Sequence, residues 1–223
     1  MERLRKLLIE DGWTPPVHEQ LCSILAGPPG VACFDWDETC ASGDLGEFLL
    51  KMLDANGEKW AEYERLISKG FVPAAYAQAA MILAGKTREA AALVCSEAVD
   101  LAISSASVVI RPEISALIGA FQLAGWDVWV VTASTPYVVE EAALKVGVER
   151  ERVLGMRLAV VDGLYTKAID GPVCYGPGKV DAIMRAIGQK PDFAAGDTWT
   201  DLEMFNLLHT RWLLVIGSQT LLR

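Results

Sequence analysis

The chain has 223 residues, of which 52% are hydrophobic and 22% are charged, and its formal net charge is −9 at pH 7. This size and composition predict a globular protein with one substantial core and a small second unit. The acidic balance argues against a nucleic-acid partner, because binding to a phosphate backbone needs clustered Lys and Arg.

The first thirty residues predict a helical arm that ends at the breaker Gly27-Pro28-Pro29-Gly30. Basic and apolar residues alternate over the first ten positions, without the apolar run of a signal peptide, and no stretch of about 18 apolar residues follows. We therefore expect a cytoplasmic protein with no membrane segment. The five cysteines are scattered without a Cys-x-x-Cys pair, which favours reduced, buried thiols.

Two carboxylates follow the first predicted strand. Asp35 and Asp37 belong to the segment DWDET, which comes directly after the apolar run 31–34. Because a strand alternates faces with a period of two, both side chains can point into the crevice beyond the end of the strand. Two like charges this close are costly unless a cation neutralises them or one of them takes a proton. A simple Asp-rich turn is the alternative interpretation.

The remaining elements alternate between helix and strand. Residues 43–107 are rich in Ala, Leu, Glu, Met and Lys without strand-like alternation, which predicts a helical insert. This order of elements predicts a parallel, doubly wound sheet with the insert as a lid over the crevice. The elements expected after the insert are helix 112–124, strand 126–131, helix 136–146, a hairpin of 156–161 and 164–166 turning at Asp162-Gly163, helix 180–187, and strands 193–195 and 213–216.

Three further motifs follow DWDET in order: Thr132 at a strand end, Gly178-Lys179, and the segment GDTWTD at 196–201. With these four motifs the chain resembles the haloacid dehalogenase-like (HAD) phosphohydrolase superfamily, in its phosphoserine phosphatase-like branch, from Val31 to the C-terminus. The resemblance implies an α/β fold with a doubly wound parallel sheet, the HAD-like Rossmannoid core, formed by 1–42 plus 108–223. It also implies a small helical cap domain formed by 43–107.

The resemblance also implies roles for the motif residues. Asp35 would be the nucleophile that forms an aspartyl-phosphate, and Asp37 would protonate the leaving oxygen and then deprotonate water. Dehalogenases lack an acid at the position of Asp37, so phosphate chemistry is expected. Thr132, the backbone N–H of Ala133, and Lys179 would bind the phosphoryl oxygens.

The expected cofactor is Mg²⁺. Its ligands would be the Asp35 carboxylate, the Asp37 carbonyl and Asp197, with Asp201 reaching the ion through water or supporting its ligands. Gly196-Asp197 could instead begin a helix, which Asp also favours. Thr200 departs from the family pattern, because relatives commonly carry Asn there, and a hydroxyl has fewer donors than an amide.

The expected partner is a small phosphorylated metabolite, and the oligomeric state is open. In the branch that the chain resembles, an acidic residue after the first motif contacts a substrate amino group, a role that Asp44 or Glu47 could take. Tyr76 to Leu83 contains no Arg for a substrate carboxylate. We therefore expect a phosphocholine- or phosphoethanolamine-like ester ahead of phosphoserine.

Aromatic residues could form a cage for an alkylammonium group through cation–π contacts. The candidates are Trp36, Trp60, Tyr63 and Tyr76. The alternatives are that these residues pack in the cap and that Asp44 only caps a helix. Two other functions stay open: a degenerate domain that binds a phosphorylated metabolite without turnover, and phosphoryl transfer to a second alcohol.

Overall fold

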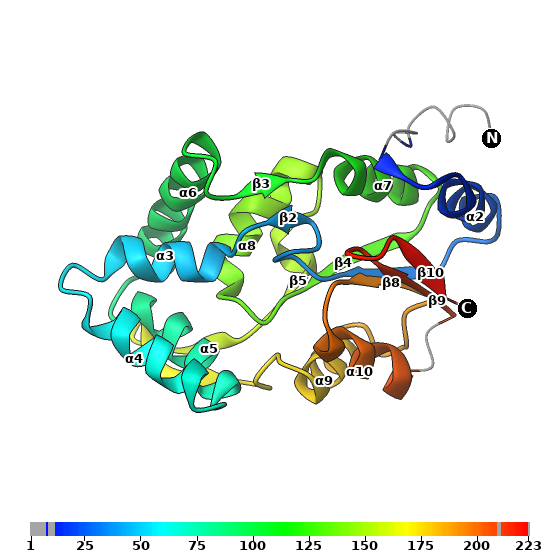
Figure 1. The fold of residues 1–223 in the computed structure, drawn as a ribbon. Coiled ribbons are helices and arrows are strands. Elements are labelled where there is room, and N and C mark those ends of the chain that lie inside the picture. Colours follow the sequence, from blue (N-terminus) through cyan, green and yellow to red (C-terminus); the bar gives the residue numbers. More distant parts are fainter. Residues whose placement is uncertain (1–7, 9–11, 209–210, 223) are drawn as a thin grey trace.

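The computed structural model describes residues 8, 12–208 and 211–222. A six-stranded sheet in the order β10-β9-β8-β1-β4-β5 forms its centre (Figure 1). Pairing is parallel from β9 to β5, and β10 joins the edge in the antiparallel sense. The strands are β1 (Val31–Phe34), β4 (Asp127–Val131), β5 (Val153–Leu154), β8 (Phe193–Gly196), β9 (Trp212–Val215) and β10 (Thr220–Leu222).

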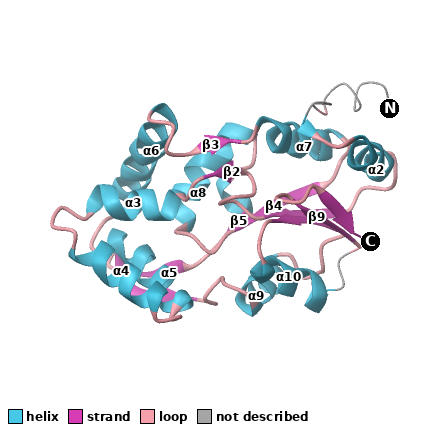
Figure 2. Ribbon diagram, viewed as in Figure 1, coloured by secondary structure: helices cyan, strands magenta, loops and turns pink. Residues whose placement is uncertain are grey.

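Helices cover both faces of this sheet, as the doubly wound prediction requires (Figure 2). Strand β1 is buried along its whole length, and its side chains alternate between two hydrophobic clusters. Ala32 and Phe34 belong to the larger cluster, whereas Val31 and Cys33 belong to the smaller one. The larger cluster includes residues of α2 (Pro15–Leu25), α7 (Pro112–Leu123) and α8 (Pro136–Ala143), and the smaller one includes residues of α9 (Pro177–Ala186) and α10 (Trp199–Leu208).

The segment 43–107 contains only helices as regular elements, as predicted. They are α3 (Leu45–Leu53), α4 (Glu58–Ser68), α5 (Val72–Ala80), the 3-10 helix Met81–Leu83 and α6 (Arg88–Ser104). Two short strands that the sequence analysis missed, β2 (Ala41–Ser42) and β3 (Val109–Ile110), pair antiparallel at its two ends. The chain therefore leaves and rejoins the core at neighbouring points, while the division into core and cap stays a prediction.

The hairpin is formed by β6 (Arg157–Val161) and β7 (Leu164–Asp170), with β7 longer than predicted. Its turn residues Asp162 and Gly163 both have positive φ, as a two-residue Asp-Gly turn requires. Two helix boundaries differ from the prediction. Helix α8 gives way to a 3-10 helix at Leu144–Val146, and α9 begins at Pro177, so that Lys179 lies in its first turn.

Two expectations from composition can be compared with the structure. All five cysteines are buried free thiols, as predicted. Among the described residues, no helix combines the length and the apolar character that crossing a membrane requires.

Candidate active site

A polar cavity of about 220 Å³ lies beyond the carboxyl ends of β1, β4 and β8. The loops after these strands and the first turn of α9 supply most of its wall, and Asp44, which precedes α3, and α5 supply the rest from the insert. Neighbouring parallel strands end at the same edge, so residues far apart in sequence meet there. The cavity is lined by Asp35, Asp37, Glu38, Asp44, Val72, Tyr76, Ala133, Ser134, Tyr175, Lys179, Asp197, Thr198 and Asp201.

Asp35 is held at both carboxylate oxygens. Its Oδ1 accepts a hydrogen bond from Lys179 Nζ at 2.7 Å, and its Oδ2 accepts one from Thr39 Oγ1 at 3.0 Å. The backbone N–H of Asp35 donates to the Ala195 carbonyl at 2.9 Å, which continues the pairing of β1 with β8. The side chain therefore has one fixed orientation at the base of the cavity.

Asp37 connects the core to the insert. Its Oδ1 accepts a hydrogen bond at 2.9 Å from the backbone N–H of Leu45, the first residue of α3. Burial, together with the nearby Asp44 carboxylate, raises the pKa of Asp37 well above its ordinary value. The protonated form is therefore favoured, and in that form Asp37 can donate a proton into the cavity.

Lys179 is buried between two carboxylates, because its Nζ also donates to Asp201 Oδ1 at 2.6 Å. Burial alone would lower the pKa of Lys179, but Asp35 and Asp201 more than reverse this effect and raise it above its ordinary value. The amine is therefore a permanent positive charge. Asp201 Oδ2 accepts from the backbone N–H groups of Asp197 and Thr198, which fixes the loop after β8.

The acidic groups fit a divalent cation. Ligand oxygens of Asp35, Asp197 and Asp201 lie within 4.8 Å of one another. Lys179 is the one cationic side chain among the described residues that line the cavity, so their carboxylates outnumber it. Burial raises the pKa of Asp35 to about 7 and that of Asp197 to about 6, and nearby Asp201 adds to both shifts. Oxygen ligands that repel one another in this way suit Mg²⁺.

Two of the three predicted phosphate-binding residues line the cavity, and the third, Thr132, does not. The two that line it are Ala133 and Lys179. The Thr132 side chain is fully buried, and its Oγ1 accepts from the backbone N–H of Ser134 at 3.0 Å. Thr132 therefore shapes the loop after β4, while Ser134, which the sequence analysis did not assign, lines the cavity.

Of the two predicted substrate-binding acids, Asp44 lines this cavity and Glu47 does not. Asp44 also caps α3, accepting from the Glu47 backbone N–H at 2.7 Å, while its contact with a substrate amino group stays a prediction. The Glu47 carboxylate accepts from Tyr63 Oη at 3.2 Å and pairs with Lys51, on a different cavity of about 520 Å³.

The aromatic cage does not form as predicted. Trp36 is fully buried in the core and cannot reach a ligand. Trp60 stacks on Tyr63, and the Lys51 amine lies 3.7 Å from its ring centroid. Tyr76 alone of the four lines the cavity.

Tyr175, which the sequence analysis did not single out, lines the cavity beside Tyr76. It lies in the loop before α9 and stacks on Tyr76 with ring centroids 5.9 Å apart. The pair links the insert to the core at the cavity wall. The Thr200 side chain is outside the described part of the structure, so the departure from Asn there stays open.

The parallel sheet and the buried acid–lysine cluster at its carboxyl edge define an α/β enzyme. Residues 32–206 match the haloacid dehalogenase-like hydrolase family. The chain belongs to this family, as its four motifs predicted. No curated protein matches the sequence.

Solved structures share the fold at low sequence identity. A conserved protein of unknown function from Anaerococcus prevotii DSM 20548 has a TM-score of 0.72 at 16% identity, covering 89% of this chain and 84% of that one. A protein of unknown function from Bordetella pertussis Tohama I has a TM-score of 0.67 at 20% identity, covering 82% and 88%. A substrate-bound phosphoserine phosphatase has a TM-score of 0.58 at 17% identity, covering 85% and 86%.

Proposed function

We propose that the protein is a Mg²⁺-dependent phosphatase that hydrolyses a small phosphate monoester through a phosphorylated Asp35. The observation that supports this most directly is the arrangement of Asp35, whose two oxygens are held by Lys179 and Thr39. Asp37, two residues away, lines the same cavity with a raised pKa. A fixed nucleophile beside a proton donor is what this hydrolysis requires.

The reaction has two balanced steps. In the first, an Asp35 oxygen attacks phosphorus, the bond from phosphorus to the ester oxygen breaks, and Asp37 gives its proton to the leaving oxygen. In the second, Asp37 takes a proton from a water molecule that attacks the phosphorus of phospho-Asp35. The bond to Asp35 breaks, inorganic phosphate leaves, and both aspartates regain their starting states.

Lys179 and Mg²⁺ would offset the negative charge of the phosphoryl group. Asp35, Asp197 and Asp201 would hold the ion, which supplies charge neutralisation at the phosphoryl oxygens. Lys179 contributes a fixed charge from a buried position, where electrostatic stabilisation is stronger than in bulk water.

Hydrolysis of p-nitrophenyl phosphate, followed by phosphate release, tests this proposal. Turnover should require Mg²⁺ and disappear in EDTA, and restoring Mg²⁺ should restore it. Full turnover in chelator would exclude the proposed chemistry. Saturable phosphate binding without release of product under any metal condition would favour the degenerate binding domain.

The acidic and aromatic lining of the cavity favours a positively charged leaving group. Asp44, Glu38, Tyr76 and Tyr175 line the cavity, and its described lining offers no second cation for a substrate carboxylate. Burial raises the pKa of Asp44 to about 6, so this group is mainly ionised at pH 7.5. The small volume and the acidic wall support a phosphoethanolamine- or phosphocholine-like ester over phosphoserine.

Asp44→Asn separates recognition from folding, because Asn caps a helix about as well as Asp. The variant should keep its melting temperature and its activity on p-nitrophenyl phosphate. Its KM for phosphoethanolamine should rise about tenfold, as expected for a lost charge-assisted hydrogen bond. A wild-type preference for a sugar phosphate or nucleotide, or an unchanged KM in Asp44→Asn, would contradict ammonium recognition.

A further inference from the structure

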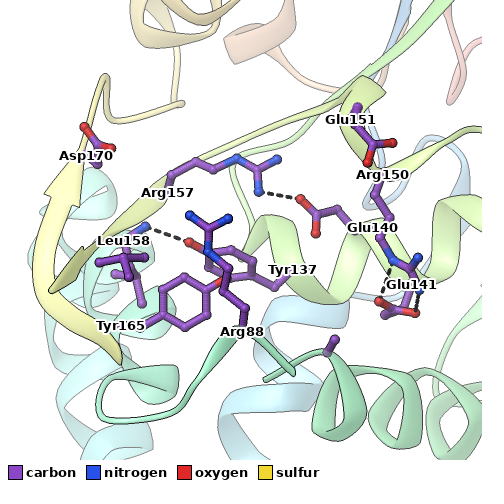
Figure 3. A pocket seen from close by; sticks show the side chains of 12 residues that line it. Arg88, Tyr137, Glu140, Glu141, Arg150, Glu151, Arg157, Leu158, Tyr165 and Asp170 are labelled. Atoms are coloured by element: carbon purple, nitrogen blue, oxygen red, sulfur yellow. Dashed lines mark hydrogen bonds and ion pairs between the residues drawn. The ribbon is translucent and has the colours of Figure 1, made fainter. Parts of the chain in front are cut away.

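A third cavity lies where the helical insert meets the rest of the chain (Figure 3). Its volume is about 660 Å³, and it shares no lining residue with the cavity at Asp35. Its walls come from α6 on one side, and from α8, the segment 150–151 and the hairpin β6–β7 on the other.

Backbone hydrogen bonds hold the two sides together beside this cavity. Tyr165 of β7 donates from its N–H to the Lys86 carbonyl at 2.9 Å, and Gly85 donates to the Tyr165 carbonyl at 2.8 Å. The loop before α6 therefore lies against the hairpin. A ligand that touched both walls would stabilise this contact.

Two of the three arginines that line the cavity are neutralised by fixed glutamates. Arg150 makes two parallel hydrogen bonds of 2.8 Å to Glu141, and Arg157 pairs with Glu140 at 2.5 Å. Both glutamates are on α8 and are largely buried. These pairs hold the guanidinium groups in defined positions.

Arg88 is different. It is the first residue of α6, and within the described part of the chain no carboxylate forms an ion pair with it. Figure 3 shows its guanidinium group in the middle of the cavity, between Arg157 and the rings of Tyr137 and Tyr165. Its donors therefore face a space that can hold another molecule.

Tyr137 adds a hydrogen-bond donor to the same space. Its Oη accepts a hydrogen bond from the backbone N–H of Leu158 at 2.8 Å. The Tyr137 and Tyr165 hydroxyls also share a hydrogen bond, which leaves one hydroxyl hydrogen of the pair for donation. The Arg157 guanidinium carbon lies 5.6 Å from the Tyr137 ring centroid. Arg88, Arg157 and the Tyr137–Tyr165 pair thus present donors to this cavity from both of its walls.

We propose that this cavity binds a small organic anion, a carboxylate or a phosphate, between Arg88 of the insert and Arg157 of the core, and so fastens the insert to the hairpin. The cavity exceeds the size of a single inorganic ion, and Ala92 and Val160 give it apolar wall for an organic body. Glu151 and Asp170 also line it and would repel a polyanion.

Binding of two probes tests the site. Malonate represents the carboxylate class, and methylphosphonate, which has no ester bond to hydrolyse, represents the phosphate class. Calorimetric titration of the full chain with Mg²⁺ should show saturable binding of at least one probe. In Arg88→Gln that affinity should fall about tenfold or more, because a charge-assisted pair is lost. Arg65→Gln is the matched control, since Arg65 is an exposed arginine of α4 paired with Glu62, and the affinity of this variant should not change.

Amide hydrogen exchange locates the bound probe. The probe should slow exchange in peptides that contain Gly85 and Tyr165 in the wild type and not in Arg88→Gln. Binding of only one probe would assign the chemical class. Absence of binding by both probes, or equal affinity in wild type and Arg88→Gln, would overturn the proposal. Neither readout depends on turnover. Methylphosphonate that binds wild type and Arg88→Gln equally, without slowing exchange at Gly85 and Tyr165, would report the cavity at Asp35 instead.

Discussion

Asp35 is buried and accepts hydrogen bonds from Lys179 at one oxygen and from Thr39 at the other. Asn has nearly the same shape as Asp, and its amide oxygen can still accept one of these two hydrogen bonds. Asp35→Asn should therefore fold with a melting temperature close to that of the wild type while phosphate release falls below a few per cent. Asp37→Asn should be similarly severe, because it removes the proton donor. Circular dichroism and phosphate release measure the two properties. Substantial activity in Asp35→Asn, with deamidation excluded by mass spectrometry, would place the nucleophile elsewhere.

Lys179 has a structural role as well as the proposed catalytic one. Lys179→Met leaves the buried carboxylates of Asp35 and Asp201 without their cation, a change that typically costs about 3–5 kcal/mol. Urea unfolding in EDTA at pH 7.5 should show this loss, and Mg²⁺ should restore part of it. Lys190→Met, at an exposed position, is the control and should leave the free energy of unfolding nearly unchanged. Equal stability of Lys179→Met and wild type would mean that the ion pairs contribute nothing.

At the scale of the elements, the first turn of α9 positions Lys179, and Gly178 allows that turn to form. A Cβ on Gly178 would overlap the carbonyl oxygen of Val173 in the preceding loop. Gly178→Ala should therefore displace the loop that carries Tyr175 and lower both the melting temperature and kcat. The matched control is Gly119→Ala in α7, where an added Cβ has no neighbour within 4 Å. That change should stabilise the protein by about 0.5–1 kcal/mol. A neutral Gly178→Ala would show that the loop adapts freely.

The same elements show what a sequence can predict. Strand β1 and the Asp-Gly hairpin follow from local patterns, namely an apolar run and a turn that needs two residues with positive φ. Strands β2, β3 and β5 have two residues each, which is too short for a periodic pattern. They form because the packing of the longer elements brings their partner segments into hydrogen-bonding distance.

In the candidate site, too, local sequence patterns predict some residues, whereas others depend on tertiary packing. Asp35, Asp37, Lys179 and Asp197 could be predicted because each comes at a motif beside a predicted element, and the structure brings them to one cavity. Tyr175 could not, since its place in the wall depends on how the insert packs on the core. Trp36 was assigned to a cage because sequence spacing cannot tell a buried side chain from one that faces a cavity.

The molecule as a whole carries buried acids whose ionisation opposes folding when no metal is bound. Burial raises the pKa of Asp35 to about 7 and the pKa values of Asp44 and Asp197 to about 6, compared with about 3.9 for an aspartate in an unfolded chain. Between about pH 4 and pH 7 the folded protein therefore holds protons that the unfolded chain has released. Raising the pH through this range must lower the free energy of unfolding of the metal-free protein. Mg²⁺, which binds the ionised carboxylates of the folded state, should reverse the loss.

Melting temperatures in EDTA should accordingly fall between pH 5 and pH 7.5, and saturating Mg²⁺ should raise the value at pH 7.5 much more than the value at pH 5. Asp197→Asn removes one titrating group and one metal ligand together. It should therefore show a shallower pH dependence in EDTA and a smaller rise with Mg²⁺, measured by differential scanning calorimetry on both proteins at equal concentration. If wild type and Asp197→Asn had the same pH dependence and the same response to Mg²⁺, the acidic cluster would be neither the source of the instability nor the metal site.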